Sequence, residues 1–502
     1  MADIPLPIAL VQAGLQTGDY CALIAYFGSL LLVGYYFSKR EKTTDDYFRG
    51  GKRVAWYAAG LSIVATKLSA VSYMSLPAKS FDANWLYILL PVGNLAAAWF
   101  VAKLVIPFYC RLNVTTVYEY LEARFDVRVR IVGGLAFPVY EIARMGILFL
   151  LPSIALAVVA DLNIFACIAI MGVIATIYTL MGGVEAVIWT DFAQVLVMLG
   201  GAALAIALIV YRVPGGSPEI ISAAAEAGKL RAFDWSFDLT TATVWVFVLH
   251  WVGGFKNYIA NQTLAQRYIS TRDEKQAARS VWLAGFVGVL TSWLLLATGT
   301  AIYSYYRAFP DRVDSSMGTP DEIFPTFIVN EMPVGVAGLL IAAIFSAAMS
   351  SLDSAINSSS AVIVTDLQRR FRPAASERAY LLTGRTLTAI LGLFGTAVAL
   401  FLATIDIRSL FDKTMEFFGL FGGGLGGVFL LGVLTTRANS TGVLIGFFVS
   451  AAIQYFVKMH TPLHFFLYIF TGMASCYVVG YVASLAFRGD RKSLNGLTVF
   501  TA

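Results

Sequence analysis

One long apolar stretch, residues 335–365, carries a row of oxygen-bearing side chains. They recur at i, i+3, i+4 and i+7, a spacing that places them along one face of a helix. Stacked oxygens on a buried helix face suit a hard monovalent cation, because such an ion needs several oxygens to replace its hydration shell. We therefore predict that this segment binds a cation. The row consists of Ser350, Asp353, Ser354 and Asn357, with Ser351 beside it.

A second polar cluster interrupts the apolar stretch 55–77 about halfway along its length. Residues Ala65–Ser72 combine hydroxyls, β-branched side chains and a lysine, Lys67, which together make a poor continuous helix. We expect the backbone to unwind here, because a broken transmembrane helix can turn its carbonyl oxygens toward an ion. The two clusters together predict a cation site between 55–77 and 335–365.

Two further charges lie within or at the start of apolar stretches, and each has two interpretations. Asp191 stands at the start of the stretch 188–211, so its carboxylate either caps the helix dipole or takes part in binding. Arg144 lies one turn after Glu141. Because an arginine stays protonated, it must pair at this depth, either with Glu141 or with a substrate carboxylate.

The composition excludes most classes of soluble protein. Of the 502 residues, 58% are hydrophobic and only 13% are charged, which is too few charges to cover a water-facing surface. This composition excludes a cytosolic enzyme and a nucleic-acid-binding module. The four cysteines show no paired spacing, so a disulfide scaffold is excluded as well. The sequence contains no HExxH, GxSxG or P-loop motif, and its three histidines do not cluster. We expect a protein that is not an enzyme.

Thirteen apolar stretches predict an all-α integral membrane protein with thirteen transmembrane helices. With the N-terminus outside, the cytoplasmic segments hold 22 Lys and Arg residues and the external segments hold 8. We therefore expect a short external N-terminus (1–19), a transmembrane domain (20–487) and a cytoplasmic tail (488–502). The stretches are 20–38, 55–77, 85–109, 131–160, 163–181, 188–211, 241–262, 281–306, 335–365, 381–404, 408–433, 438–458 and 463–487.

Short motifs follow one another in a fixed order along the chain. They are Tyr47–Gly51, Pro77–Lys79, Tyr118–Asp126, Met181–Glu185, Ile188–Asp191, Gln266–Tyr268 and the serine row described above. From about residue 20 to residue 487, this order resembles the sodium:solute symporter family. Within the family, the chain is most similar to the bacterial sodium-coupled sialic acid symporters.

The resemblance implies a LeuT-like fold, a five-plus-five inverted repeat with one extra N-terminal and two extra C-terminal helices. The two halves would span about 55–211 and 241–433. An inverted repeat predicts a second broken helix at the start of the second half. The glycine pair within Trp251–Asn257 interrupts the stretch 241–262 there, which supports the same fold from the residues alone.

The resemblance also assigns binding residues position by position. It implies a main sodium site at the break, a second sodium position deeper along the serine row, and a substrate pocket beside them. The main sodium site would use the carbonyls of Ala65, Leu68 and Ala347 and the hydroxyls of Ser350 and Ser351. The second position would use Ser350, Asp353, Ser354 and Asp191. The substrate would meet Ser69 and Ser72, with its carboxylate on Arg144.

Three positions depart from the sialic acid type, in which Lys67 is a threonine, Asp353 a serine and Pro91 a substrate-contacting glutamine. The loss of the glutamine weakens the case for sialic acid itself, whereas Arg144 still favours an anionic ligand. Lys67 has three interpretations. It pairs with Asp353 across the two helices, it replaces sodium as a built-in cation or proton carrier, or it joins Arg144 in holding an anionic substrate.

The predicted function is sodium-coupled symport by alternating access, importing a carboxylate-bearing solute of the sialic acid, sugar acid or monocarboxylate class. The alternative is a proton-coupled or sodium-independent transporter in which Lys67 stands in for the cation. A channel is less favoured, because broken helices in both halves indicate alternating access, and a membrane receptor would need a separate partner protein for signalling. We expect a bacterial-type inner membrane location, Na⁺ as the coupling ion, and a small anionic molecule and the lipid bilayer as partners. Nucleic acid and an obligatory protein partner are not expected.

Overall fold

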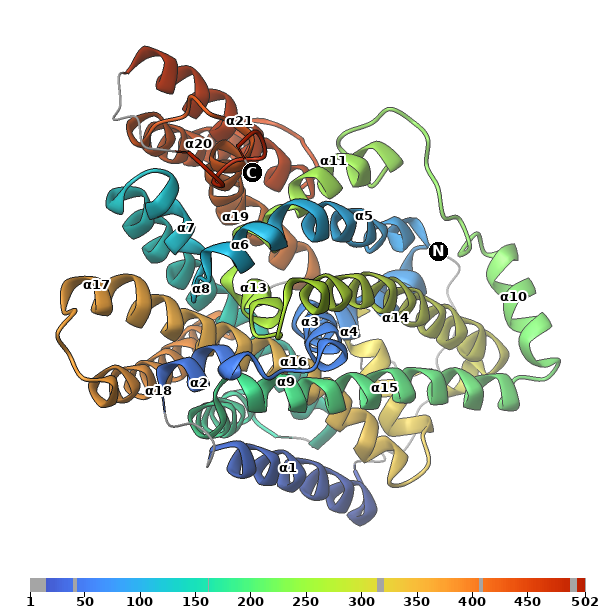
Figure 1. Ribbon diagram of the computed structural model, residues 1–502. Helices are drawn as coiled ribbons and strands as arrows, with labels where there is room; N and C mark the ends of the chain where they lie inside the picture. The colour runs from blue at the N-terminus through green and yellow to red at the C-terminus, as the bar shows by residue number, and fades with distance from the viewer. Residues whose placement is uncertain are drawn as a thin grey trace.

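The computed structural model describes residues 15–38, 43–160, 162–313, 320–405, 410–487 and 494–501. Within these ranges the chain is helical, and its β structure is limited to one isolated bridge between Val54 and Thr271. Figure 1 shows a bundle with α1 and the pair α20 and α21 at opposite edges of the view. Most of the predicted external segment 1–19 and half of the predicted tail lie outside the described residues.

Ten described helices are long and apolar enough to cross a membrane, and the bent pair α3 and α4 raises this number to eleven. An all-helical membrane protein is therefore confirmed, whereas the count of thirteen is not. The long helices are α1 (Thr17–Ser38), α8 (Val127–Ala160), α9 (Ile164–Arg212), α14 (Glu274–Ala308), α16 (Val336–Val362), α18 (Glu377–Leu402), α19 (Leu410–Leu434), α20 (Ser440–His460) and α21 (Leu467–Ala486). Another span runs through η2 (Leu86–Leu89), α5 (Val92–Phe100), η3 (Val101–Val105) and α6 (Ile106–Leu112). Shorter helices are α2 (Thr44–Arg49), η1 (Gly50–Lys52), α7 (Val117–Arg124), α10 (Gly216–Glu226), η4 (Pro310–Arg312), η5 (Pro320–Glu322), α15 (Ile323–Glu331), η6 (Ile363–Gln368) and α17 (Arg369–Phe371).

The two expected stretches 163–181 and 188–211 both lie within α9. Its backbone departs from helical geometry at Gly183, with φ 49° and ψ −167°, a conformation that glycine adopts without steric cost. Before this break, α9 begins with the apolar segment Ile164–Ile177. The long α9 is therefore two helices that meet at a glycine.

The predicted interruption of the stretch 55–77 is confirmed. The stretch forms α3 (Trp56–Lys67) and α4 (Ala70–Asp82), whose axes differ by 62°. Between them Leu68 has φ −86° and ψ 73°, outside the helical region. The lysine and hydroxyl cluster therefore ends one helix and begins another, which leaves carbonyl oxygens at the end of α3 free to face a ligand.

The stretch 241–262 is also interrupted, but the glycine pair is not where the backbone departs most. The segment divides into α11 (Val244–Gly254), α12 (Lys256–Ile259) and α13 (Gln262–Ile269), and Asn261 is extended at φ −103° and ψ 108°. Gly253 has a different role, because a Cβ there would lie 2.6 Å from Ile469 of α21. The helix therefore ends at Gly254, within the predicted interval Trp251–Asn257, and a second interruption follows at Asn261.

Helix α16 lies inside the bundle and packs against α1, α3, α8, α9 and α13. From Ala337 to Val362 all of its residues are buried except Leu339. The serine row of the sequence therefore faces protein along its whole length, and it does not face lipid. Hydroxyl groups in this position need partners on neighbouring helices.

We expect Gly299→Ala to destabilise the protein by about 1–3 kcal/mol, the usual cost of overpacking. A Cβ at Gly299 in α14 would overlap the backbone carbonyl of Pro77 in α4, a helix that follows the break. The melting temperature of the purified protein measures the effect. Gly288→Ala on the same helix is the control, because a Cβ there meets no atom within 4 Å. Equal melting temperatures for the two variants would contradict this packing argument.

Candidate functional site

The end of α3 and the middle of α16 bring hydroxyl and carbonyl oxygens together. The Ser350 hydroxyl donates to the carbonyl oxygen of Ala65 at 2.9 Å and to that of Ala347 at 3.4 Å. The Ser351 hydroxyl donates to the carbonyl oxygen of Thr66 at 3.3 Å. Predicted oxygens from both helices thus lie within hydrogen-bonding distance of one another, at the place where α3 ends.

This arrangement suits a monovalent cation. A hydroxyl that rotates its proton away presents lone pairs to an ion, and the carbonyls at the end of α3 already lie within reach of these hydroxyls. Leu68 is buried at the break, next to these groups in sequence. Among the described residues, no group of three or more His, Cys, Asp or Glu side chains is arranged to hold a metal ion. The site is therefore of the oxygen type that Na⁺ prefers.

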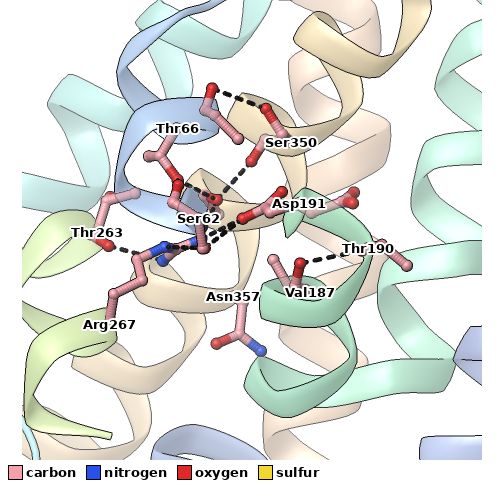
Figure 2. A network of polar contacts seen from close by, with 12 residues as sticks. Ser62, Thr66, Val187, Thr190, Asp191, Thr263, Arg267, Ser350 and Asn357 are labelled. Carbon is pink, nitrogen blue, oxygen red and sulfur yellow. Dashed lines mark hydrogen bonds and ion pairs between the residues drawn. The ribbon is translucent and has the colours of Figure 1, made fainter. Parts of the chain in front are cut away.

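A second polar network lies deeper, between α3, α9, α13 and α16 (Figure 2). Asp191 of α9 is completely buried, and its Oδ2 accepts a hydrogen bond of 2.5 Å from the Ser62 hydroxyl of α3. The Arg267 guanidinium of α13 forms an ion pair with the same oxygen at 3.6 Å. Because Asp191 lies inside α9, beyond the break at Gly183, the interpretation of this residue as a dipole cap is wrong.

Arg267 is the residue that sequence reasoning missed. The positive-inside count placed it in a cytoplasmic loop, 264–280, but it is completely buried. It donates to the carbonyl of Thr263 at 2.6 Å and to the hydroxyls of Ser62, at 3.2 Å, and Ser354. An arginine near the end of an apolar stretch has the same appearance in sequence whether it enters water or turns inward. Its presence in the motif Gln266–Tyr268 was the available signal.

Asp353 adds a second carboxylate to this network. Its Oδ1 accepts a hydrogen bond of 2.5 Å from Thr179 of α9, and it interacts electrostatically with Asp191 and Arg267. One oxygen of each carboxylate, Asp191 Oδ1 and Asp353 Oδ2, is buried and has no hydrogen-bond partner in the part of the chain that the structure describes. Two carboxylates and one guanidinium leave a net charge of −1, which a single monovalent cation or a proton would neutralise.

A cavity opens on the other side of the break in α3 and α4. All four predicted substrate residues line it, namely Lys67, Ser69, Ser72 and Arg144. Pro91 lines it too, at the position where the sialic acid type has a glutamine. Other lining residues include Asn94, His250, Trp251, Asn257, Asn261 and Phe418. The cavity therefore combines cations, hydroxyls and amides with aromatic walls, as small-molecule sites do.

The two cations of the cavity have different partners. Arg144 donates to the Glu141 carboxylate at 2.7 Å, the internal ion pair that the sequence allowed, and its guanidinium lies over the Phe418 ring. Lys67 Nζ donates to the Asn94 amide oxygen at 2.5 Å and to the Tyr258 hydroxyl at 3.0 Å. Asn94 and Tyr258 were not predicted, since neither contact can be read from sequence spacing.

The proposed pair between Lys67 and Asp353 is not formed. Both residues are described, and the contacts of Lys67 go to α5 and α12 while those of Asp353 go to α9. No ion pair within 4.0 Å joins the two side chains, so this interpretation is wrong. The lysine belongs to the cavity and the aspartate belongs to the buried network.

The chain is similar to known membrane transporters over most of its length. A family model described as the sodium:solute symporter family matches residues 47–450. The Sodium/sialic acid symporter NanT of Aliivibrio fischeri is 35% identical over 95% of each chain. The Sodium/sialic acid symporter SiaT of Proteus mirabilis is 36% identical over 93% of this chain and 95% of its own. A solved structure of a Na⁺-coupled sialic acid symporter, substrate-bound and outward-open, superposes with a TM-score of 0.89 at 34% identity, over 95% of this chain and 100% of that one.

Proposed function

The chain belongs to the sodium:solute symporter family, and we propose a sodium-coupled import mechanism in which a carboxylate-bearing solute occupies the cavity at the break between α3 and α4. The protein is a sodium-coupled symporter and not an enzyme. The observation that carries the mechanism is the contact of the Ser350 and Ser351 hydroxyls with carbonyls at the end of α3. A cation bound there would join α16 to the broken helix.

The main sodium ion is assigned to the oxygens at the break. Sodium binding at this place would fix the end of α3 and order the cavity residues that follow it, so that ion and solute each favour the binding of the other. The cation would also offset the electrostatic repulsion between the carbonyl oxygens that lie close together there. Its ligands are the carbonyls of Ala65, Leu68 and Ala347 and the hydroxyls of Ser350 and Ser351.

A second sodium ion is assigned to the buried network. The net charge of −1 and the two unpartnered carboxylate oxygens favour a cation here. Ser354 connects the two positions, because its hydroxyl lies 3.2 Å from that of Thr66 and it bonds to the Ser350 carbonyl. The ligands are Asp191, Asp353 and Ser354, with Ser350 at the border of the main site.

The solute is assigned to the sialic acid, sugar acid or monocarboxylate class. Ser69 and Ser72 follow the break directly and offer hydroxyls, while Lys67 and Arg144 supply positive charge. The sialic acid symporters to which the chain is similar transport a solute within this range. Small anionic solutes of these classes share a carboxylate and differ in their hydroxyl groups.

The finer architecture is also a proposal. The fold is LeuT-like, and we assign thirteen spans. Eleven of them are long and apolar enough to cross a membrane. The other two are Ile164–Ile177 and the interrupted segment that runs from α11 through α13. The two halves are then about 55–211 and 241–433. The distribution of Lys and Arg favours a bacterial inner membrane protein with its N-terminus outside and its C-terminus on the cytoplasmic side.

Proton coupling is the second candidate function. It is favoured by the same two unpartnered oxygens, Asp191 Oδ1 and Asp353 Oδ2, since a carboxyl proton neutralises the network as a sodium ion does. Replacement of sodium by Lys67 is not favoured, because its ammonium donates to Asn94 and Tyr258 and not to the oxygens of the sodium sites.

Uptake into proteoliposomes tests the main sodium site, with labelled N-acetylneuraminate, D-gluconate and pyruvate as probes. We expect Ser351→Ala to raise the sodium concentration for half-maximal uptake roughly tenfold, because one ligand oxygen is lost. Ser360→Ala is the matched control, since the Ser360 hydroxyl of the same helix donates to Gly384 of α18. Equal uptake by the wild-type protein without sodium and without a pH gradient would indicate facilitated diffusion instead.

A further inference from the structure

We propose that Lys67, and not Arg144, binds the anionic group of the solute. This inference rests on the proposed function, because it assigns the recognition of the solute within the same cavity. It departs from the expectation that the resemblance gave, which puts the carboxylate on Arg144. The observations that distinguish the two residues are the direction of the Lys67 side chain, the partners of each cation and their access to the cavity.

The direction of the Lys67 side chain separates it from the sodium sites. Its backbone lies at the end of α3, beside Thr66, whose carbonyl faces Ser351. The ammonium nevertheless extends to Asn94 and Tyr258, which come from α5 and α12. The ammonium group of Lys67 therefore lies at the wall of the cavity in which the solute would bind.

The partners of the two cations differ in charge. Glu141, itself completely buried, already neutralises Arg144 through a contact of 2.7 Å. Among the described residues, the contacts of the Lys67 ammonium are an amide oxygen, a phenol and the face of the Tyr258 ring at 4.3 Å, all of them neutral. A sequestered ammonium without a counter-ion is costly, and an anionic solute would remove that cost. A carboxylate on Arg144 would instead have to compete with Glu141.

Lys67 also has one N–H donor that these two contacts do not use. An ammonium group carries three N–H donors, and the contacts with Asn94 and Tyr258 use two of them. The lysine is partly exposed along the cavity, whereas Arg144 is only 7% exposed. A solute carboxylate can therefore reach Lys67 without displacing a protein group.

The other residues that line the cavity indicate which chemical groups the solute carries besides its carboxylate. Ser69 and Ser72 follow Lys67 along the chain, and Asn257 and Asn261 approach from the second broken segment. These side chains both donate and accept hydrogen bonds, as the hydroxyls of a solute require. The substrate class assigned by the structure is thus a hydroxylated monocarboxylate whose acid group lies next to Lys67.

Thermal stability of the purified protein in sodium tests this assignment. The probes are N-acetylneuraminate, D-gluconate and pyruvate, each compared with its neutral methyl ester. A solute that binds the folded protein raises its melting temperature. We expect at least one acid to stabilise the wild-type protein and its ester to have no effect. In Lys67→Gln, the acid concentration that gives the same shift should rise roughly 10- to 100-fold, the value of a charged hydrogen bond.

The double variant Glu141→Gln/Arg144→Gln is the comparison, because it removes the second cation together with its partner. We expect it to retain the response to the acid. Loss of the response in this double variant with an unchanged response in Lys67→Gln would overturn the proposal, as would equal stabilisation by acid and ester. Failure of every acid to stabilise the wild-type protein would also overturn it. The shift caused by sodium alone reports on the proposed function separately, and Lys67→Gln should preserve that shift.

Discussion

Replacing Arg267 with leucine is expected to lower the free energy of unfolding by about 3–5 kcal/mol, the cost of breaking a buried ion pair on one side. Arg267 is completely buried, and its guanidinium satisfies Asp191, Ser62 and the carbonyl of Thr263. Leucine would leave the Asp191 carboxylate with one hydroxyl donor and no positive charge nearby. The melting temperature and the yield of folded protein in detergent measure the loss.

The partner variant gives the matched control for this prediction. Asp191→Asn combined with Arg267→Leu removes both charges, so the double variant should recover most of the stability that Arg267→Leu loses. Arg370→Leu should have an effect below about 1 kcal/mol, because that arginine forms a half-exposed ion pair with Glu122. If the double variant were no more stable than Arg267→Leu, the lost stability would belong to packing and not to the ion pair.

The broken helix and the buried serine row could be predicted because both are local properties of the sequence. A lysine among hydroxyls within Ala65–Ser72 is costly in a continuous membrane helix wherever the rest of the chain lies. The i, i+3, i+4, i+7 spacing of polar residues fixes one face of α16 by helix geometry alone. Neither prediction depends on knowing which helices are neighbours.

The partners across helices could not be predicted, because they depend on how distant segments approach one another. One interpretation of the sequence paired Lys67 with Asp353, since each is a charge in place of a neutral residue. In the structure the lysine faces α5 and α12, while the aspartate faces α9. Arg267 was misplaced for a related reason, because an inward-turning arginine and a loop arginine have the same local sequence.

Glycine also occurs where two helices pack closely, which limits what a glycine pair predicts about helix breaks. The Gly253–Gly254 pair predicted the second break, yet Gly253 packs against Ile469 and the extended residue is Asn261. The sequence therefore identified the interruption at Gly254 and missed the further one at Asn261. Close approach of two helices and a break in one helix both favour glycine, and only the neighbouring helix distinguishes them.

The Asp353 carboxylate provides the sharpest test of the ion that the buried network binds. A charge about 4 Å from a monovalent cation contributes about 4 kcal/mol at an effective dielectric constant of 20. We therefore expect Asp353→Asn to weaken sodium binding at the second position by two to three orders of magnitude. The second position would then stay empty at the sodium concentrations used in an uptake assay. The sodium dependence of uptake should change from cooperative to simple saturation, with the main site still occupied.

The asparagine is nearly isosteric and can still accept the hydrogen bond from Thr179, so the change is mainly one of charge. Asp366→Asn is the control, because it neutralises a buried carboxylate that pairs with Arg130 at 2.7 Å beyond the end of α16. It should leave the sodium dependence unchanged even where it lowers stability.

The same variant separates sodium from protons. If the network carries sodium, the cooperativity should be lost in Asp353→Asn at every external pH, and a pH gradient should not replace sodium in the wild-type protein. If it carries a proton, wild-type uptake should follow the pH gradient at constant sodium, and Asp353→Asn should abolish that response while the sodium dependence stays as it was. The network has one negative charge to neutralise, and this pair of measurements identifies whether sodium or a proton neutralises it.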